Sequence, residues 1–239
     1  MDNLLNALKE NESLLKDIAN HPAINYMFLG ILRNIERTIP EDCRQQYYYN
    51  LSCLRIVLGE KTECSINAPV IVIDGKLLKL ADLGYVRSHI NFKDALLEEL
   101  YHEMLHLAST EYRVDANSHV FGYSGFIMNN IDFISSNQVF NGLNEGFTQY
   151  LTILNTDLNM ANYDLQVECA KKLVELVGID VVKQCYFNNS LGMKPIFDKL
   201  ETLGVDIDFL YDLEEKCHSD LIYHLAGNDK EQEEIKPFL

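Results

Sequence analysis

Apolar residues recur three and four positions apart in the first quarter of the chain, the spacing that places them on one face of a helix. The stretch 3–20 keeps this spacing as far as Pro22, and 24–38 keeps it as far as Pro40. A third stretch, 41–58, has the same pattern. Because a helix usually ends before a proline, the pattern predicts three N-terminal helices with these bounds.

The pattern changes in residues 66–85. Residues 70–73 are four consecutive β-branched residues, which is typical of a strand. Asp74-Gly75 follows, a dipeptide that favours a two-residue hairpin turn. We therefore predict that residues 76–80 return antiparallel to residues 70–73. The free edge of such a strand can align an extended peptide; a purely structural hairpin is the alternative.

The longest uninterrupted helical pattern covers residues 92–110. Asn91 can accept a hydrogen bond as its N-cap, and the charge of Asp94 suits the helix N-terminus. Residues 111–140 are rich in glycine, asparagine and serine, so we expect an irregular connection there. Helical spacing resumes at residues 143–156.

Further helices are predicted over 163–177, 179–187, 193–202 and 206–225. One short β segment among so many helices indicates an α+β fold that is mainly helical. We expect three segments packed as one compact unit: an N-terminal helical segment (1–65), a core (66–160) and a C-terminal helical segment (161–239).

Composition narrows the possible partners and compartment. The 239 residues carry 20 basic and 36 acidic side chains, a net charge of −16. Nucleic acids and anionic membranes bind basic patches, so we expect neither as a partner. The sequence contains no apolar run of about 18 residues, the length of a membrane-spanning helix. Without a recognisable signal peptide, the six cysteines are expected to be free thiols and the protein cytoplasmic.

The helix predicted over residues 92–110 contains His102-Glu103-Met104-Leu105-His106. Two histidines at i and i+4 lie one turn apart on the same helix face, as a zinc ion requires of two imidazole ligands. Glu103 then lies close enough to act as general base on a metal-bound water. An ordinary helix with surface or core histidines is the structural alternative.

A third ligand is available in Leu143-Asn144-Glu145-Gly146-Phe147. A carboxylate on a second helix would complete a His/His/Glu site and leave the fourth zinc position for water. The alternative for Glu145 is an ordinary surface or capping carboxylate.

With these two motifs the sequence resembles the gluzincin clan of zinc metallopeptidases, in which HExxH precedes a glutamate ligand on another helix. The Asn-Glu-Gly string is similar to the third-ligand motif of the aminopeptidase branch. The resemblance implies that His102, His106 and Glu145 bind Zn²⁺ and that Glu103 is the catalytic carboxylate. It also implies a peptide or protein substrate and a gluzincin-like core.

The sequence departs from the known branches of the clan at three points. Glu145 follows His106 by 39 positions, a longer gap than in those branches, and no GAMEN-like exopeptidase sequence precedes the helix. Some thermolysin-like relatives carry an aspartate four residues after the glutamate ligand, where it orients a histidine, and Gln149 occupies that place here. Asn144, Thr148 or a backbone carbonyl is the expected substitute.

A peptidase of this kind usually adds a donor to the oxyanion. The candidates, each of which has a structural alternative, are Tyr123, Tyr186, Tyr211 and His218, with His119 as a further conceivable site group. A zinc-binding regulatory or interaction protein with little hydrolytic activity is the alternative function, and a helical binding module without metal is a third. The sequence leaves the oligomeric state and the substrate open.

Overall fold

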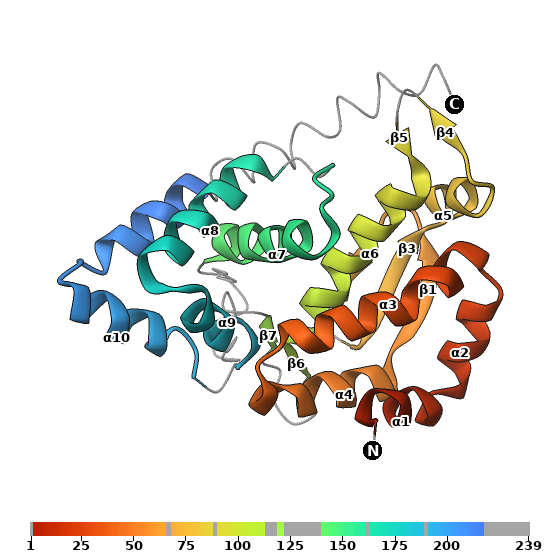
Figure 1. Cartoon of the computed structure of the whole chain (residues 1–239), viewed down its shortest axis with the longest axis horizontal. Coiled ribbons are helices and arrows are strands. Elements are labelled where there is room, and N and C mark those ends of the chain that lie inside the picture. The colour runs from red at the N-terminus through yellow and green to blue at the C-terminus, as the bar shows by residue number, and fades with distance from the viewer. Residues whose placement is uncertain are drawn as a thin grey trace, which may run out of the picture.

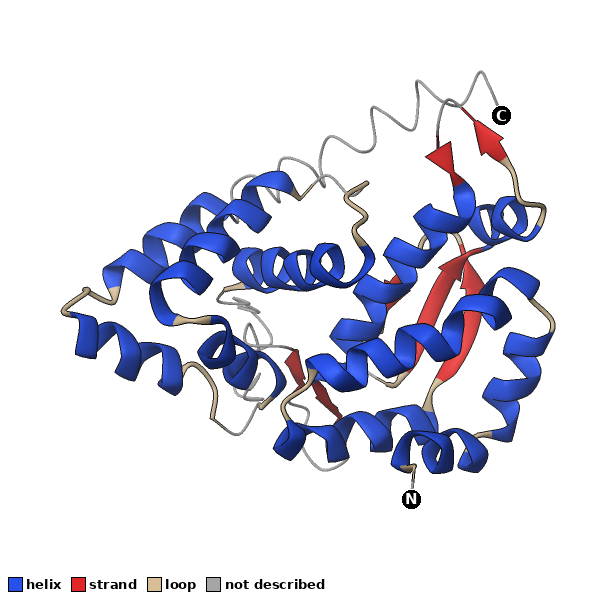
Figure 2. Ribbon diagram, in the orientation of Figure 1, coloured by secondary structure: helices blue, strands red, loops and turns tan. Residues whose placement is uncertain are grey.

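The computed structural model describes residues 2–65, 68–87, 90–112, 119–121, 140–160, 163–188 and 191–217. These residues form a mainly helical protein with a small sheet, which confirms the predicted α+β class (Figure 2). Apart from Val167, the buried apolar side chains of the described residues belong to one cluster that extends from Leu4 to Cys217. None of the described helices combines the length and apolar character needed to cross a membrane.

The N-terminal part contains α1 (Asn3–Glu10), α2 (Glu12–Ala19), α3 (Pro22–Thr38), η1 (Glu41–Cys43) and α4 (Arg44–Cys53). The single helix predicted over 3–20 is therefore wrong, because the chain breaks at Asn11. The side chain of Asn11 accepts a hydrogen bond from the Leu14 amide at 3.2 Å. It also donates to the carbonyls of Leu51 and Leu54, at 2.9 and 2.7 Å. This buried amide ties the break to the end of α4.

The sheet consists of β1 (Arg55–Gly59), β2 (Glu63–Cys64) and β3 (Val70–Asp74) in the order β1-β3-β2. β3 pairs parallel with β1 and antiparallel with β2. The predicted strand at 70–73 is confirmed, but it is the central strand, so the free edge expected for it is wrong. The predicted helix 41–58 is wrong beyond Cys53, where β1 follows. The β1–β3 pairing joins the predicted segments 1–65 and 66–160 in one sheet.

The predicted return strand at 76–80 is wrong, because α5 (Gly75–Asp82) begins there. Asp74 caps this helix: its Oδ1 accepts hydrogen bonds from the amides of Lys76 and Leu77, at 2.7 and 3.2 Å. Asp-Gly suits a helix N-terminus as well as a hairpin turn. The apolar face of the following residues packs inward and selects the helix.

Helix α6 (Phe92–Ser109) crosses the middle of the molecule, preceded by the short hairpin β4 (Val86–Arg87) and β5 (Ile90–Asn91). The predicted cap is confirmed, because Asn91 Oδ1 accepts a hydrogen bond from the Lys93 amide at 3.1 Å. Figure 1 shows the sheet and N-terminal helices on one side of α6 and α7–α10 on the other. A second hairpin, β6 (Thr110–Tyr112) with β7 (His119–Phe121), follows α6.

The C-terminal part consists of α7 (Asn141–Thr156), α8 (Asp164–Val177), α9 (Ile179–Phe187), α10 (Lys194–Leu203) and helical residues 208–217. These helices confirm the predicted ones to within a few residues over the described range. α7 packs closely on α8 at Gly146, where an added Cβ would lie 2.2 Å from the carbonyl oxygen of Gln166. The glycine of the Asn-Glu-Gly motif thus allows the close approach of the two helices.

Candidate metal centre

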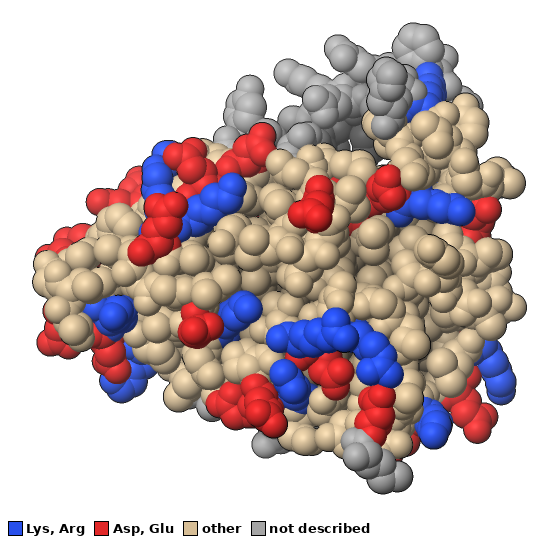
Figure 3. All heavy atoms as spheres, in the orientation of Figure 1, with Lys and Arg blue, Asp and Glu red and all other residues tan. Residues whose placement is uncertain are grey.

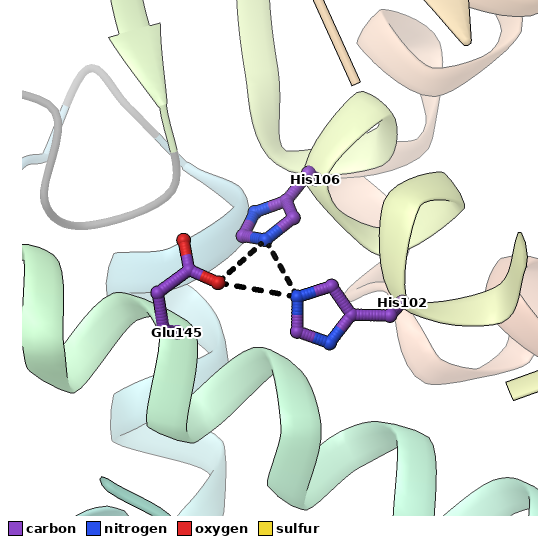
Figure 4. Close-up of side chains that lie close together, drawn as sticks. All are labelled: His102, His106 and Glu145. Carbon is purple, nitrogen blue, oxygen red and sulfur yellow. Dashed lines mark hydrogen bonds and ion pairs between the residues drawn. The ribbon is translucent and has the colours of Figure 1, made fainter. Parts of the chain in front are cut away.

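Three side chains converge where α6 faces α7 (Figure 4). His102 and His106 come from α6, and Glu145 comes from α7. The two Nε2 atoms lie 3.0 Å apart, and Glu145 Oε2 lies 3.2 Å from Nε2 of His102 and 3.3 Å from Nε2 of His106. The structure therefore brings the three predicted ligands together, although they are 43 positions apart at the extremes.

Helix α6 presents both histidines because they are one turn apart on its buried face. His102 is 6% exposed and His106 is 2% exposed. The C-terminal end of α6 is held by the buried amide of Asn50 in α4, which donates to the carbonyls of Leu107 and Thr110 at 2.7 and 2.8 Å. The N-terminal half of the chain thus fixes the helix that carries two of the three ligands.

The three atoms fit a metal ion in number, chemistry and spacing. Two imidazole nitrogens and one carboxylate oxygen lie within 4.8 Å of one another. Ligand atoms about 2.0–2.1 Å from a tetrahedral ion are separated from each other by about 3.3 Å. The observed separations of 3.0–3.3 Å match three corners of such a tetrahedron. The group can therefore hold a metal ion with one coordination position left over.

The same contacts determine the charges of the group without a metal. Burial disfavours protonation of His102, but hydrogen bonding to Glu145 and the charges of Glu103 and Glu145 raise the pKa of His102 to about 9. Burial also disfavours ionisation of Glu145, yet the charge of His106 and hydrogen bonds from both histidines hold the pKa of Glu145 well below its usual range. Without a metal, these contacts therefore favour a protonated His102 beside an ionised Glu145.

Glu103 lies beside the triad and faces the sheet. Its Oε2 accepts a hydrogen bond from the backbone amide of Cys64 in β2, at 2.7 Å. Burial raises the pKa of Glu103, although the charges of His102 and His106 act in the opposite direction. The edge strand β2 thus holds one carboxylate oxygen and leaves the other for a further partner.

The partner of the first histidine is Gln149, which the sequence interpretation passed over. Its Oε1 lies 2.9 Å from Nδ1 of His102. The expected substitute Thr148 bonds instead to Tyr186, at 2.7 Å. The side-chain polar atoms of Asn144 are buried and have no hydrogen-bond partner among the described residues. The amide of Gln149 takes the place for which the sequence suggested other groups.

Two further groups near His102 are not among the residues predicted from the sequence. Glu98, which is 2% exposed, accepts a hydrogen bond from Gln149. The ring of Tyr163 stacks on that of His102, with centroids 5.6 Å apart and planes 11° from parallel. Burial, followed by the charges of Glu145 and Glu103, raises the pKa of Tyr163. The chain brings Tyr163 to the site only after it has turned back from α7, so no local spacing indicates it.

The predicted donors are not at the triad where the structure describes them. Tyr186 is fully buried and bonds to Thr148 on α7. Tyr211 is 48% exposed and packs on Phe140, with ring centroids 5.4 Å apart. Tyr123, His218 and the side chain of His119 lie outside the described residues.

The site combines three side chains that can bind a cation with the carboxylate of Glu103 beside them. The phenol ring of Tyr163 stacks on one of the three, His102. Such a set can activate a water molecule and polarise a carbonyl group when a metal is bound. No protein-family model, curated protein or solved structure matches this chain. The functional interpretation therefore depends on the site itself.

Proposed function

We propose that this protein is a zinc-dependent peptidase of the gluzincin type. One observation carries the proposal: three ligand atoms at tetrahedral spacing lie beside Glu103, whose carboxylate is anchored by the Cys64 amide. Structural zinc sites are usually closed by a fourth protein ligand, whereas catalytic sites keep that position open. The cluster found among the described residues has three members, which favours catalysis over a purely structural site.

Zinc suits this ligand set. Two imidazoles and one carboxylate are typical of catalytic zinc, whereas magnesium and calcium prefer all-oxygen sites. Iron(II) also binds two histidines and one carboxylate. We choose zinc because Glu103 directly follows the first histidine, the position of the general base in HExxH zinc peptidases. When bound, zinc supplies a water of lowered pKa and polarises the substrate carbonyl.

In this mechanism Glu103 moves the proton. Its raised pKa makes it a better proton acceptor than an exposed carboxylate. Glu103 takes a proton from the attacking water and returns it to the leaving amine. The Cys64 amide keeps the carboxylate in place throughout.

The edge strand β2 and Tyr163 suggest how a peptide is held. β2 has a sheet neighbour on one side only among the described strands, and because the Cys64 amide on its other edge already binds Glu103, an extended peptide would meet the Cys64 carbonyl there. Tyr163 stays protonated because its pKa is raised, and it can donate to the oxyanion. We therefore place the substrate between β2 and Tyr163, and replacement of Tyr163 by phenylalanine should slow cleavage about 10–100-fold.

Cleavage of a peptide library by zinc-loaded protein tests the proposal. We expect hydrolysis by the wild type and a loss of at least about 10³-fold in Glu103→Gln, because proton transfer and water activation are both impaired. Glu168→Gln, on the surface of α8, is the matched control and should cleave at the wild-type rate.

Two results would contradict the proposal. A Glu103→Gln protein that binds zinc normally and cleaves as fast as the wild type would remove Glu103 from the mechanism. A wild type that binds zinc in stoichiometric amount and cleaves no peptide would favour the zinc-binding regulatory protein.

A further inference from the structure

We propose that Gln149 and Glu98 form a positioning relay that sets the ring tautomer of His102 and so presents its Nε2 lone pair to the metal. The inference rests on the metal site of the proposed function and adds two residues that bind neither metal nor substrate. Both are positioning residues, since they act through His102.

The relay is a continuous chain of hydrogen bonds between α6 and α7. His102 Nδ1 lies 2.9 Å from Gln149 Oε1. Gln149 Nε2 donates to Glu98 Oε1 at 2.7 Å. Glu98 then accepts the backbone amide of Met160, which lies 2.9 Å from Oε1 and 2.8 Å from Oε2. A ligand histidine is thus connected through a neutral amide to a buried carboxylate.

The direction of every bond in the relay follows from its far end. The backbone N–H of Met160 can only donate, so the Glu98 carboxylate accepts from it. The same carboxylate takes the Gln149 NH₂ group, which leaves the Gln149 carbonyl oxygen facing His102. A carbonyl can only accept, so Nδ1 of His102 must carry the proton. When the His102 ring is neutral, its lone pair therefore lies on Nε2, the atom that faces Glu145 and His106.

The two relay residues lie one helical turn from two of the ligands, on the same helices. Glu98 precedes His102 by four residues on α6, and Gln149 follows Glu145 by four residues on α7. One level of the helix pair holds two metal ligands, and the next level holds the two relay residues. Glu98 is 2% exposed and Gln149 is fully buried, so water is poorly placed to replace either group.

If the relay is correct, the protein should tolerate an exchange of the amide at position 149 and the carboxylate at position 98. In Glu98→Gln/Gln149→Glu the amide and carboxylate change places. Residue 149 would still accept from His102, residue 98 would still donate to residue 149, and its carbonyl would still accept from Met160. Gln149→Glu alone instead places a second carboxylate against that of Glu98. The Glu98 carboxylate then loses the NH₂ group that donates to it, and the two negative charges repel each other.

The test measures the zinc Kd by competition with a chelator, after thermal unfolding has shown that each variant folds. Gln149→Met keeps the length of the side chain and removes the acceptor. We expect it to weaken zinc binding about 10–100-fold, as loss of a hydrogen-bond partner behind a metal ligand does. Glu98→Gln and Gln149→Glu should each weaken binding, and the double exchange should recover it to within about threefold of the wild type.

Nitrogen-15 NMR of the histidine rings provides a readout that general destabilisation would not change. We expect the wild-type zinc protein to show His102 protonated at Nδ1 and bound at Nε2, and Gln149→Met to lose the hydrogen-bonded Nδ1 signal. Asn11→Ala is the control, because Asn11 is also buried and its amide donates to the carbonyls of Leu51 and Leu54 in the N-terminal part of the chain. It should leave both zinc Kd and the His102 signal unchanged.

The failure of the relay is distinguishable from the failure of the proposed function. A wild type that binds zinc, together with a Gln149→Met protein of the same zinc Kd, would overturn the relay alone. A double exchange that binds no better than its single variants would also overturn it. A wild type that binds no zinc would overturn the metal site itself, and the relay with it.

Discussion

The two helices that carry the proposed metal ligands are held by opposite halves of the chain. α6 has its own N-cap in Asn91, and Asn50 of α4 binds its C-terminal carbonyls. α7 follows Phe140, whose φ is 66°, and no side chain at that position caps it. Instead Glu214 accepts hydrogen bonds from the α7 amides of Gly142 and Leu143, each at 2.8 Å.

This difference makes the site a junction between two halves of the molecule. The pair of histidines is fixed by the N-terminal half and the sheet, whereas Glu145 is carried by α7, which packs on α8 (Figure 1) and whose first amides bond to Glu214. A metal ion that binds all three ligands should therefore stabilise the docking of the two halves.

Charged side chains of both signs lie interspersed on the face shown in Figure 3, and they form no single basic patch there.

Removal of one ligand from either side should have the largest effect. Structural zinc sites bind with about 10–16 kcal/mol, so loss of one ligand should weaken zinc binding about 10²–10³-fold. We expect His106→Ala and Glu145→Ala to lose affinity to a similar extent, and the zinc-induced rise in Tm to vanish in both. Isothermal titration and thermal unfolding measure these effects. Normal zinc affinity in Glu145→Ala would show that the site does not bridge the halves.

Gly146→Ala should disrupt the side of α7 that packs on α8. The added Cβ would lie 2.2 Å from the Gln166 carbonyl oxygen, so the helices must move apart, at a cost of about 1–3 kcal/mol or more. Gly30→Ala in α3 is the matched control, since no atom lies within 4 Å of its added Cβ. That control should stabilise the protein by about 0.5–1 kcal/mol, because alanine favours helix. Denaturant unfolding measures both, and equal effects would contradict the close packing at Gly146.

Zinc binding should strengthen as pH rises towards 9. Without metal the pKa of His102 is raised from 6.5 to about 9, so the proton must leave before the ligand can bind. Affinity should rise by up to about tenfold per pH unit over this range, with proton release on binding. The stability of the metal-free protein should change in the opposite sense: the contribution of protonated His102 is complete below pH 6.5 and is lost as pH rises through about 9. Calorimetry in buffers of different ionisation enthalpy measures the released protons, and their absence would contradict the raised pKa of His102.

Asn91 and Glu214, which bond to the first amides of α6 and α7, should differ in their effect on zinc binding. Asn91→Ala removes the local cap of α6 and should cost about 1 kcal/mol of stability with little change in zinc affinity, because Asn50 and the core still hold the helix. Glu214→Ala should cost a similar amount and also weaken zinc binding, because Glu214 holds the start of the helix that carries Glu145. Unfolding and zinc titration of both variants test the contrast. Equal zinc affinities would show that Glu214 only stabilises the fold.

Features that depend on residues close together in the chain can be predicted from the sequence, whereas features that depend on distant residues cannot. Asn91, His102 and His106 lie on one helix, so spacing along the chain is enough to place them together. Asp74-Gly75 is a local signal as well, but it fits both a hairpin turn and a helix cap, and only the packing of the following residues distinguishes them. The break at Asn11 depends on carbonyls some 40 positions away, so the spacing of residues 3–20 cannot reveal it.

The surroundings of the ligands depend on tertiary packing and are therefore harder to predict. Glu98 is a buried carboxylate one turn before His102, a position from which the helix spacing could have suggested a partner. Tyr163 and Glu214 reach the site only through the turn after α7 and the packing of residues 208–217. Gln149 was at the expected position, but its role depends on Glu98, which orients its amide.

Anomalous diffraction at the zinc edge from a zinc-loaded crystal tests the central claim most directly. We expect one strong peak bound by Nε2 of His102, Nε2 of His106 and a carboxylate oxygen of Glu145. The fourth ligand should be a water within hydrogen-bond distance of Glu103. A peak elsewhere, or a fourth ligand supplied by the protein, would contradict an open catalytic zinc site.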